Sequence, residues 1–366
     1  MMPNNITIIG LGLIGGSIAR ALYDKLGIRS ITAIDSNKAS LENAIRDGVI
    51  SKGYTDLDSS IYTSDIIFLC TPVSQTINYI DKIAPSVSDR CIITDVCSTK
   101  DQIIKHVEAM SNPPCFIGGH PMAGTEKSGY ENSFSHLFEN AYYVLTPCSH
   151  AASQALNILS DIIERLGAIP IIMQSGEHDK ITGSISHLPH IIAAALVNLV
   201  NRLDSGDGRM QTLAAGGFKD ITRIASSDPE MWQNIVLSNK EQLLELTEFF
   251  KHSIDEFNKI LKREDADGIY NYFSKARQYR DSISSRPTGL LQPLYRLVVD
   301  VEDKPGIIGE IATLLGNHNI NIKNIHVTNS REFEQGCLII ALHDLASVET
   351  AFNTLVRTGY KVYRDK

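Results

Sequence analysis

The segment Ile6-Thr7-Ile8-Ile9-Gly10-Leu11-Gly12-Leu13-Ile14-Gly15-Gly16-Ser17 decides the fold of the first part of the chain. Four β-prone residues lead into a Gly-x-Gly-x-x-Gly pattern, and apolar residues at helical spacing follow it. Gly10 permits a tight turn out of the strand, Gly12 lets a pyrophosphate approach the backbone, and Gly15 lets the helix pack closely on the strand. This order of strand, glycines and helix predicts a Rossmann-like dinucleotide-binding unit.

An acidic residue after the second predicted strand supports this interpretation. Ser30 to Ile34 has the pattern of a strand, and Asp35 follows it, 20 residues after Gly15. A carboxylate at this position accepts hydrogen bonds from the adenosine ribose and repels a 2′-phosphate, which favours NAD over NADP. The alternative is a flavodoxin-like turn with an incidental aspartate. The expected cofactor contacts are Gly10, Leu11, Gly12, Leu13, Ile14, Gly15, Asp35, Thr71 and Pro72.

Length and composition limit the class of protein. A chain of 366 residues is expected to form two or three domains, and 43% hydrophobic and 21% charged residues are typical of a soluble globular protein. A net charge of −8 argues against nucleic acid and anionic membranes as partners. The sequence has no apolar run of the roughly 18 residues that a membrane helix needs, and no N-terminal signal pattern.

Cysteine and histidine spacing indicates the compartment and argues against a metal. The six cysteines have no Cys-x-x-Cys spacing, so we expect reduced, buried thiols in a cytoplasmic protein. The segment His187-Leu188-Pro189-His190 lacks the spacing of a zinc-protease helix. We therefore expect no metal site.

The pattern of elements changes twice along the chain. Alternating strands and helices continue to Met173, which predicts a doubly wound domain over residues 1–174. Helical patterns follow, with long helices expected over His190 to Leu203 and Pro229 to Leu261. Asp228 before Pro229 has the order of a helix start. We predict a helical substrate and dimerisation domain over residues 175–282, because long helices with broad apolar faces usually bury them against a partner.

The last part of the chain has a separate pattern. Residues 283–292 have the composition of a linker. Over residues 293–366 the expected order is βαββαβ, which predicts a ferredoxin-like domain.

Two polar groups follow predicted strands at the edge of the sheet where α/β folds bind ligands. His120 follows a strand expected over Cys115 to Gly118, and a histidine there can accept a proton, with a reference pKa of about 6.5. A purely structural histidine is the alternative. Ser98 follows the neighbouring strand and could bond His120, or it could be only the N-cap of a helix that starts at Thr99.

The helical domain contains a second group of candidates. Within Phe218 to Pro229, Asp220 and Arg223 are three residues apart and would share a helix face and pair. Arg223 could instead bind a substrate carboxylate with its two-pronged guanidinium, whereas an exposed ion pair would have little consequence. His187 and His190 could face a cleft or cap the helix they precede.

Taken together, these motifs resemble the prephenate/arogenate dehydrogenase family. The resemblance spans roughly residues 5–285 and is carried by the glycine turn, Asp95-x-x-Ser98-x-Lys100, Gly119 to Thr125, His187 to His190, and Phe218 to Pro229 with Trp232 behind it. The C-terminal part, with Asp303-x-Pro305-Gly306 and Asn321-Ile322-x-Asn324-Ile325, resembles an ACT domain, an amino-acid-sensing module.

The resemblance implies NAD-dependent oxidation and decarboxylation of prephenate to 4-hydroxyphenylpyruvate in tyrosine biosynthesis. His120 matches the family's catalytic histidine, and Ser98 matches the serine between that histidine and the substrate hydroxyl. Arg223 matches the carboxylate-binding arginine. By the same analogy the other pocket residues are His190, Thr125, Asp220 and Lys219, the last replacing a common arginine with loss of bidentate geometry.

The resemblance also implies regulation and leaves alternatives open. An effector, most plausibly L-tyrosine, is expected at Asp303, Pro305, Gly306 and Asn321, and ACT domains of two chains could pair. Arogenate is the alternative substrate, with Glu126 placed to meet its amino group. A 2-hydroxy-acid or 6-phosphogluconate-like enzyme would favour a catalytic lysine instead, and a non-catalytic NAD- and amino-acid-binding regulator would need none of these site residues.

Overall fold

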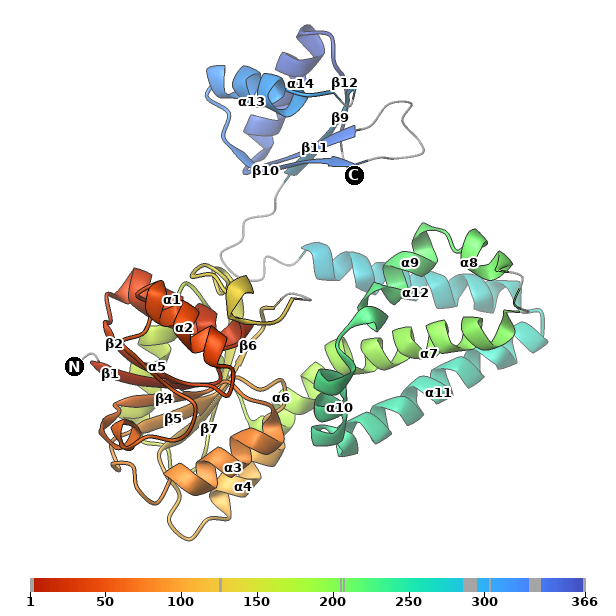
Figure 1. Cartoon of the computed structure of the whole chain (residues 1–366). Helices are drawn as coiled ribbons and strands as arrows, with labels where there is room; N and C mark the ends of the chain where they lie inside the picture. The colour runs from red at the N-terminus through yellow and green to blue at the C-terminus, as the bar shows by residue number, and fades with distance from the viewer. Residues whose placement is uncertain are drawn as a thin grey trace. The chain divides into compact units, whose positions relative to one another are not determined.

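The computed structural model describes residues 3–124, 127–204, 206, 208–285, 295–302, 304–328 and 337–364. Two compact units divide the chain, residues 1–269 and 270–366, and each is described by itself (Figure 1). This division falls within the segment that we predicted as the helical domain, and our domain bounds stay predictions.

The first unit is built on one sheet, which has eight strands in the described ranges. Their order is β3-β2-β1-β4-β5-β6-β7-β8. The bounds are β1 Asn5–Ile9, β2 Ser30–Ile34, β3 Lys52–Tyr54, β4 Ile66–Leu69, β5 Ile92–Asp95, β6 Phe116–Pro121, β7 Tyr142–Pro147 and β8 Ile169–Ile172. Neighbouring strands are parallel except β6 and β7. The strand order reverses between β1 and β4, and the Rossmann-like prediction is confirmed.

Helices cover both faces of this sheet, with α1 and α2 on one side and α3 and α4 on the other (Figure 1). The bounds are α1 Leu13–Leu26, α2 Lys38–Arg46, α3 Val73–Ile83, α4 Asp101–Glu108 and α5 Ser153–Arg165, with short 3₁₀ turns η1 Ser59–Thr63 and η2 Tyr130–Asn132. Ile18 and Leu22 of α1 and Leu159 of α5 are buried in the core on one face. Ile80 of α3 and Ile104 of α4 are buried in the core on the other. Apolar burial on both faces explains why the parallel strands are almost continuously hydrophobic.

The structure departs from the sequence patterns at three places in this sheet. Lys52-Gly53-Tyr54 forms strand β3, which is too short to show a period in the sequence. Strand β6 continues to Pro121, so His120 lies in a strand and not in a following loop. The sequence pattern does not show this extension because Gly118 and Gly119 have no side chains that could alternate. Glycine is needed there, since a Cβ on Gly119 would lie 2.5 Å from the Asp95 carbonyl oxygen. Helix α4 begins at Asp101 and has no side-chain cap, so Ser98 does not cap it.

Helices form the remainder of the first unit. They are α6 Ser175–Thr182, a π-helical turn η3 Gly183–His187, α7 Leu188–Leu203, α8 Arg209–Leu213, α9 Gly216–Thr222, the 3₁₀ turn η4 Arg223–Ser226, α10 Pro229–Ser238 and α11 Lys240–Lys262. The cap predicted for α10 is confirmed, because the Asp228 side chain accepts a hydrogen bond from Met231 N at 2.7 Å. The single helix predicted from Pro229 to Leu261 is wrong. Asn239 separates α10 from α11, and its buried side chain bonds to residues of α6 and η3.

The helical path from Ser175 to Leu203 is long and apolar. It spans 29 residues, and its most apolar 18-residue window has a mean hydropathy of 1.4 with 17% of that window buried, so length and composition alone would let it cross a membrane. Its first turn contains His178 and Asp179, which are both buried. This turn is fixed to the sheet by hydrogen bonds described below, whereas large apolar side chains farther along, such as Leu199 and Leu203, are exposed.

The second unit includes most of α12 (Ala266–Ser285) and a small α/β domain. Helix α12 continues through 283–285, where we predicted the start of the linker; the linker's remainder lies outside the described residues. The domain's elements are β9 Tyr295–Asp300, α13 Ile307–Asn317, β10 Ile322–Thr328, β11 Cys337–Leu342, α14 Leu345–Arg357 and β12 Lys361–Arg364. The strands form an antiparallel sheet in the order β10-β11-β9-β12. The ferredoxin-like βαββαβ prediction is confirmed.

Candidate active site

The glycine turn has the geometry that a pyrophosphate needs. Gly10 has φ +95°, and a Cβ there would lie 2.3 Å from the Cys70 carbonyl oxygen, so a side chain is excluded. At Gly12 a Cβ would meet nothing within 4 Å, which leaves open space before the first turn of α1. No side chain from the described residues caps α1 at Gly12. The N-terminal N–H groups of α1 are therefore oriented as in an anion-binding helix start.

The acidic residue lies beside this turn. The Asp35 side chain accepts hydrogen bonds from the backbone N–H groups of Leu11 and Asn37. A carboxylate oxygen has two lone pairs, so both oxygens can still accept a bond from a ribose hydroxyl. Thr71 and Pro72 follow β4, the strand that pairs with β1 at the point where the strand order reverses. The residues of this edge of the sheet fit a dinucleotide.

Three hydrogen-bonded side chains, the half-buried His120 and the buried His178 and Asp179, extend from the end of β6 into helix α6. His120 Nδ1 lies 2.8 Å from His178 Nε2, and His178 Nδ1 lies 2.7 Å from Asp179 Oδ1. Asp179 also accepts backbone hydrogen bonds from Lys100 at 2.8 Å and Asp101 at 2.9 Å. We call His120, His178 and Asp179 the histidine chain. It connects strand β6 of the sheet to helix α6 of the helical region through hydrogen bonds.

A buried ion pair holds the backbone in front of His120. The side chains of Asp95 and Lys100 are both fully buried and in contact. Lys100 Nζ donates to the Gly119 carbonyl oxygen at 2.8 Å, while Gly119 N donates to Asp95 Oδ1 at 3.0 Å. The pair therefore uses both backbone groups of the residue before His120, which fixes the position of that side chain.

Burial makes His120 a neutral group. It lowers the pKa of His120 well below the usual 6.5, and the nearby His178, Lys100 and His187 lower it further. Burial also lowers the pKa of His187 to about 4. At neutral pH the His120 ring is therefore unprotonated at one nitrogen, which is the state of a proton acceptor.

Aromatic and cationic groups form the helical part of the candidate site. The rings of His190 and Trp232 stack with centroids 3.8 Å apart, and His187 meets the same indole edge-on at 5.9 Å. His190 Nδ1 donates to the Ser186 carbonyl oxygen at 2.8 Å, which leaves Nε2 as the acceptor. Burial, and to a smaller degree the positive charge of Arg223, lower the pKa of His190. Trp232 Nε1 is buried without a hydrogen-bond partner among the described residues.

The remaining predicted substrate residues are exposed or isolated. Ser98 makes no hydrogen bond within the described ranges, so the expected bond to His120 is not formed here. Helix α9 ends at Thr222, and Arg223 begins η4, so Asp220 and Arg223 do not share one regular helix. Lys219, Asp220 and Arg223 are exposed, and Asp220 has no ion pair with any described residue. Thr125 and Glu126 lie outside the described residues. These roles stay predictions.

The predicted effector residues lie in the second unit. Gly306 has φ +93° and precedes α13, a conformation that favours glycine. Pro305, Gly306 and Asn321 are exposed, and Asp303 lies outside the described residues.

Sequence reasoning missed three residues that the structure brings to His120. His178 and Asp179 carry a detectable signal, because adjacent histidine and aspartate follow strand β8 at a strand-to-helix connection. Asn239 carries none, because the apolar helical pattern continues through it. Its side chain N–H group donates to the Asp179 carbonyl oxygen at 2.9 Å and lies 3.0 Å from His187 Nδ1.

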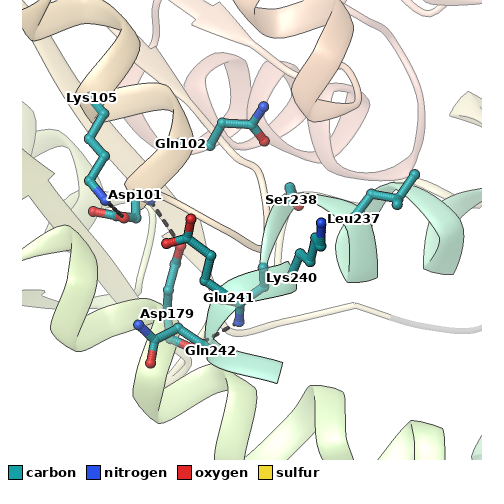
Figure 2. A pocket seen from close by; sticks show the side chains of 10 residues that line it. Asp101, Gln102, Lys105, Asp179, Leu237, Ser238, Lys240, Glu241 and Gln242 are labelled. Carbon is teal, nitrogen blue, oxygen red and sulfur yellow. Dashed lines mark hydrogen bonds and ion pairs between the residues drawn. The ribbon is translucent and has the colours of Figure 1, made fainter. Parts of the chain in front are cut away.

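A cavity of about 270 Å³ lies on the other side of Asp179, between α4 and the start of α11 (Figure 2). Ionic side chains gather around it, and Lys105 and Asp101 are paired at 2.6 Å. The lining residues are Asp101, Gln102, Lys105, Asp179, Leu237, Ser238, Asn239, Lys240, Glu241 and Gln242. The predicted site residues are not among them, so this cavity is distinct from the dinucleotide edge.

A dinucleotide edge next to a half-buried, neutral histidine defines the class of a dinucleotide-dependent dehydrogenase. Comparison with known proteins gives the family. The model for the prephenate dehydrogenase nucleotide-binding domain matches residues 18–172, that for the prephenate dehydrogenase dimerization domain matches 174–275, and that for the ACT domain matches 295–356. The chain belongs to the prephenate dehydrogenase family.

Individual relatives agree with the family models. A prephenate dehydrogenase of Bacillus subtilis is 38% identical over 93% of this chain and 92% of its own length. The crystal structure of Aquifex aeolicus prephenate dehydrogenase with hydroxyphenyl propionate and NAD⁺ has a TM-score of 0.72 and 32% identity, covering 77% of this chain and 98% of that one. Synechocystis arogenate dehydrogenase has a TM-score of 0.68 and 30% identity, covering 76% and 99%.

Proposed function

We propose that the chain catalyses the NAD-dependent oxidative decarboxylation of prephenate to 4-hydroxyphenylpyruvate, a step toward L-tyrosine. The observation that carries the proposal is the half-buried, neutral His120 at the carboxyl edge of a dinucleotide-binding sheet. Membership of the prephenate dehydrogenase family supports it. The glycine turn and Asp35 would hold NAD, which accepts a hydride when bound.

His120 would move one proton out and back. Prephenate has a hydroxyl on the ring carbon that loses the hydride. The unprotonated nitrogen of His120 accepts the hydroxyl proton as the carbonyl forms. Loss of carbon dioxide then returns an electron pair to the ring, which becomes aromatic, and the phenolate oxygen takes the proton back from His120. The protein therefore ends the reaction in its starting protonation state, and one base is sufficient.

The helical region would hold the two substrate carboxylates. Arg223 is an exposed cation near His190, and its guanidinium has the two-pronged geometry that suits a carboxylate. His190, stacked on Trp232, would form the neighbouring wall, with Thr125, Lys219 and Asp220 at the entrance. Ser98 would use its unoccupied hydroxyl to bridge the substrate hydroxyl and His120.

The test is NADH production from NAD and prephenate by the purified protein, with and without L-tyrosine. Activity on prephenate that His120→Asn removes would support the assignment. No activity on prephenate or arogenate, together with retained NAD binding, would favour the regulator that needs no catalytic histidine.

Arogenate is the second candidate substrate, favoured by the match to Synechocystis arogenate dehydrogenase. Arogenate has an amino group where prephenate has a keto oxygen, so Glu126 is the side chain expected to distinguish them. Comparing kcat/KM for the two substrates in the unmodified protein and in Glu126→Gln decides between them. A preference for arogenate that Glu126→Gln abolishes would change the proposed substrate from prephenate to arogenate.

We also propose how the protein is regulated and assembled, and the other matched domains support these proposals. We place L-tyrosine as the effector of the ACT domain, near Pro305, Gly306 and Asn321. We propose a homodimer contact on the helical region, where Leu199, Leu203 and other large apolar side chains are exposed. The ACT domains of two chains would pair further. We also propose that the protein is cytoplasmic. Light scattering with and without tyrosine measures the assembly, and inhibition lost on deleting residues 286–366 would assign the effector site.

A further inference from the structure

We propose that His178, held by Asp179, is a positioning residue that keeps His120 in the tautomer whose Nε2 is unprotonated. The inference deepens the proposed function, because it says how the base is prepared. Only the predicted effect on turnover depends on the proposed function. The tautomer itself is a property of the protein without substrate.

The direction of the two hydrogen bonds follows from Asp179. Its Oδ1 accepts from the backbone N–H group of Lys100 and lies 2.7 Å from His178 Nδ1, and its Oδ2 accepts from the backbone N–H group of Asp101. A carboxylate can only accept, so His178 Nδ1 must carry a hydrogen. In a neutral imidazole the second nitrogen is then a lone-pair acceptor. His178 Nε2 therefore accepts, and the hydrogen between the two rings belongs to His120 Nδ1.

This accounting leaves one nitrogen of His120 for chemistry. With Nδ1 protonated, Nε2 of the neutral ring has a lone pair, as a general base requires. The opposite arrangement would place the unprotonated Nδ1 of His178 against the Asp179 oxygen, lone pair facing lone pair. Because His178 and Asp179 are both about 1% exposed, water is not available to relieve that repulsion.

The surrounding elements also hold the chain in place. The Thr182 hydroxyl donates to the His178 carbonyl oxygen at 2.9 Å, and Asn239 donates to the Asp179 carbonyl oxygen. The charged and titratable groups around His120 are His178, Lys100 and its partner Asp95, and His187. Lys100 has an acceptor in Asp95 and a second in Gly119, so it does not compete for the His120 ring.

The first test measures the tautomer directly. In protein with ¹⁵N-labelled histidine, long-range ¹⁵N–¹H NMR at neutral pH should show His120 protonated at Nδ1 and unprotonated at Nε2. The signals are assigned by their loss in His120→Asn. A His120 ring protonated at Nε2 in the unmodified protein would overturn the proposal, whatever the enzyme's substrate proves to be.

The second test compares two replacements of His178. In His178→Gln the amide oxygen can accept from His120 Nδ1 while the amide N–H donates to Asp179, so the polarity of the chain is kept. In His178→Leu it is lost. We expect kcat to fall about 10²-fold in the leucine variant and less than about tenfold in the glutamine variant, with the Kd for NAD unchanged in both. Equal loss in both variants would reduce His178 to a packing role.

Two controls separate this inference from the proposed function. His106→Gln changes a half-buried histidine of α4 paired with Asp81 and should leave both kcat and the His120 signals unchanged. If the unmodified protein fails to oxidise prephenate but shows the expected tautomer, the proposed substrate is wrong and the positioning of His120 stands. If it oxidises prephenate with the opposite tautomer, the function stands and this inference fails.

Discussion

The histidine chain and the surface around Arg223 serve one candidate site and differ in almost every physical respect. His178 and Asp179 are buried, and their polar atoms are matched by hydrogen bonds within the chain. Arg223, Lys219 and Asp220 are exposed on short helical segments. One part is organised before substrate arrives, whereas the other keeps its side chains in water, where they can adjust to a ligand.

This difference suggests a division of roles. A base held in place by buried partners needs little reorganisation at the moment of reaction, so this preorganisation should affect kcat. An exposed cation contributes to the bound substrate and the transition state alike, so its removal should affect KM. The predictions below would break this division if the two effects were exchanged.

The largest effect is expected at His120. His120→Asn keeps a polar side chain of similar reach but removes the basic nitrogen, and should lower kcat about 10²- to 10⁴-fold. Affinity for NAD, measured by fluorescence titration, should be unchanged because His120 is not among the residues expected to contact the dinucleotide. Unchanged turnover would remove His120 from the mechanism.

The next effect concerns Arg223. Arg223→Ala should raise KM for prephenate about 10- to 100-fold with a much smaller change in kcat, since a charge-assisted bond to a carboxylate contributes about 1.5–3 kcal/mol. Arg223→Lys, which keeps the charge and loses the bidentate geometry, is the matched control and should fall between. A fall in kcat alone would give Arg223 a chemical role and end the comparison.

The sequence predicted those features of the fold that depend on neighbouring residues, and it did not predict those that depend on contacts between distant residues. The glycine turn, Asp35 and the βαββαβ order are local patterns, and the structure confirms the folds they predict. The histidine chain depends on residues 58 positions apart meeting across two elements. The break at Asn239 depends on a side chain that bonds to α6 and η3, and no period in the sequence records such a contact.

Glycine explains a further failure. Strand β6 carries His120, yet Gly118 and Gly119 supply no alternating side chains for a pattern to detect. The close approach of Asp95 and Thr146 requires that these positions be glycine. The absence of side chains at Gly118 and Gly119 lets strand β6 pack closely against its neighbours, and it also removes the alternating pattern by which the sequence would indicate a strand.

A smaller effect concerns stability against pH and tests the burial of the histidines. His187 has a native pKa of about 4, whereas the unfolded chain binds its proton at about 6.5. Stability is therefore full above pH 6.5 and is lost as pH falls toward 4, with a slope of at most about 1.4 kcal/mol per pH unit for this group. Thermal unfolding at pH 7, 6 and 5 should show a steeper decline in the unmodified protein than in His187→Gln. Equal slopes would mean that His187 is not protected from protonation.

The smallest effect is expected at Asp220, and it tests most closely the surface around Arg223. Its carboxylate is exposed and has no ion pair with any described residue, and exposed charges interact weakly through water. Asp220→Asn should therefore change KM for prephenate by about fivefold or less and leave kcat unchanged, with the change shrinking as salt is added. Lys219→Gln, one residue away and of opposite charge, is the control and should shift KM in the opposite direction. A large, salt-independent change in KM would instead show that Asp220 pairs directly with Arg223 when substrate binds. The surface around Arg223 would then be as specifically organised as the histidine chain, but it would become so only when substrate binds.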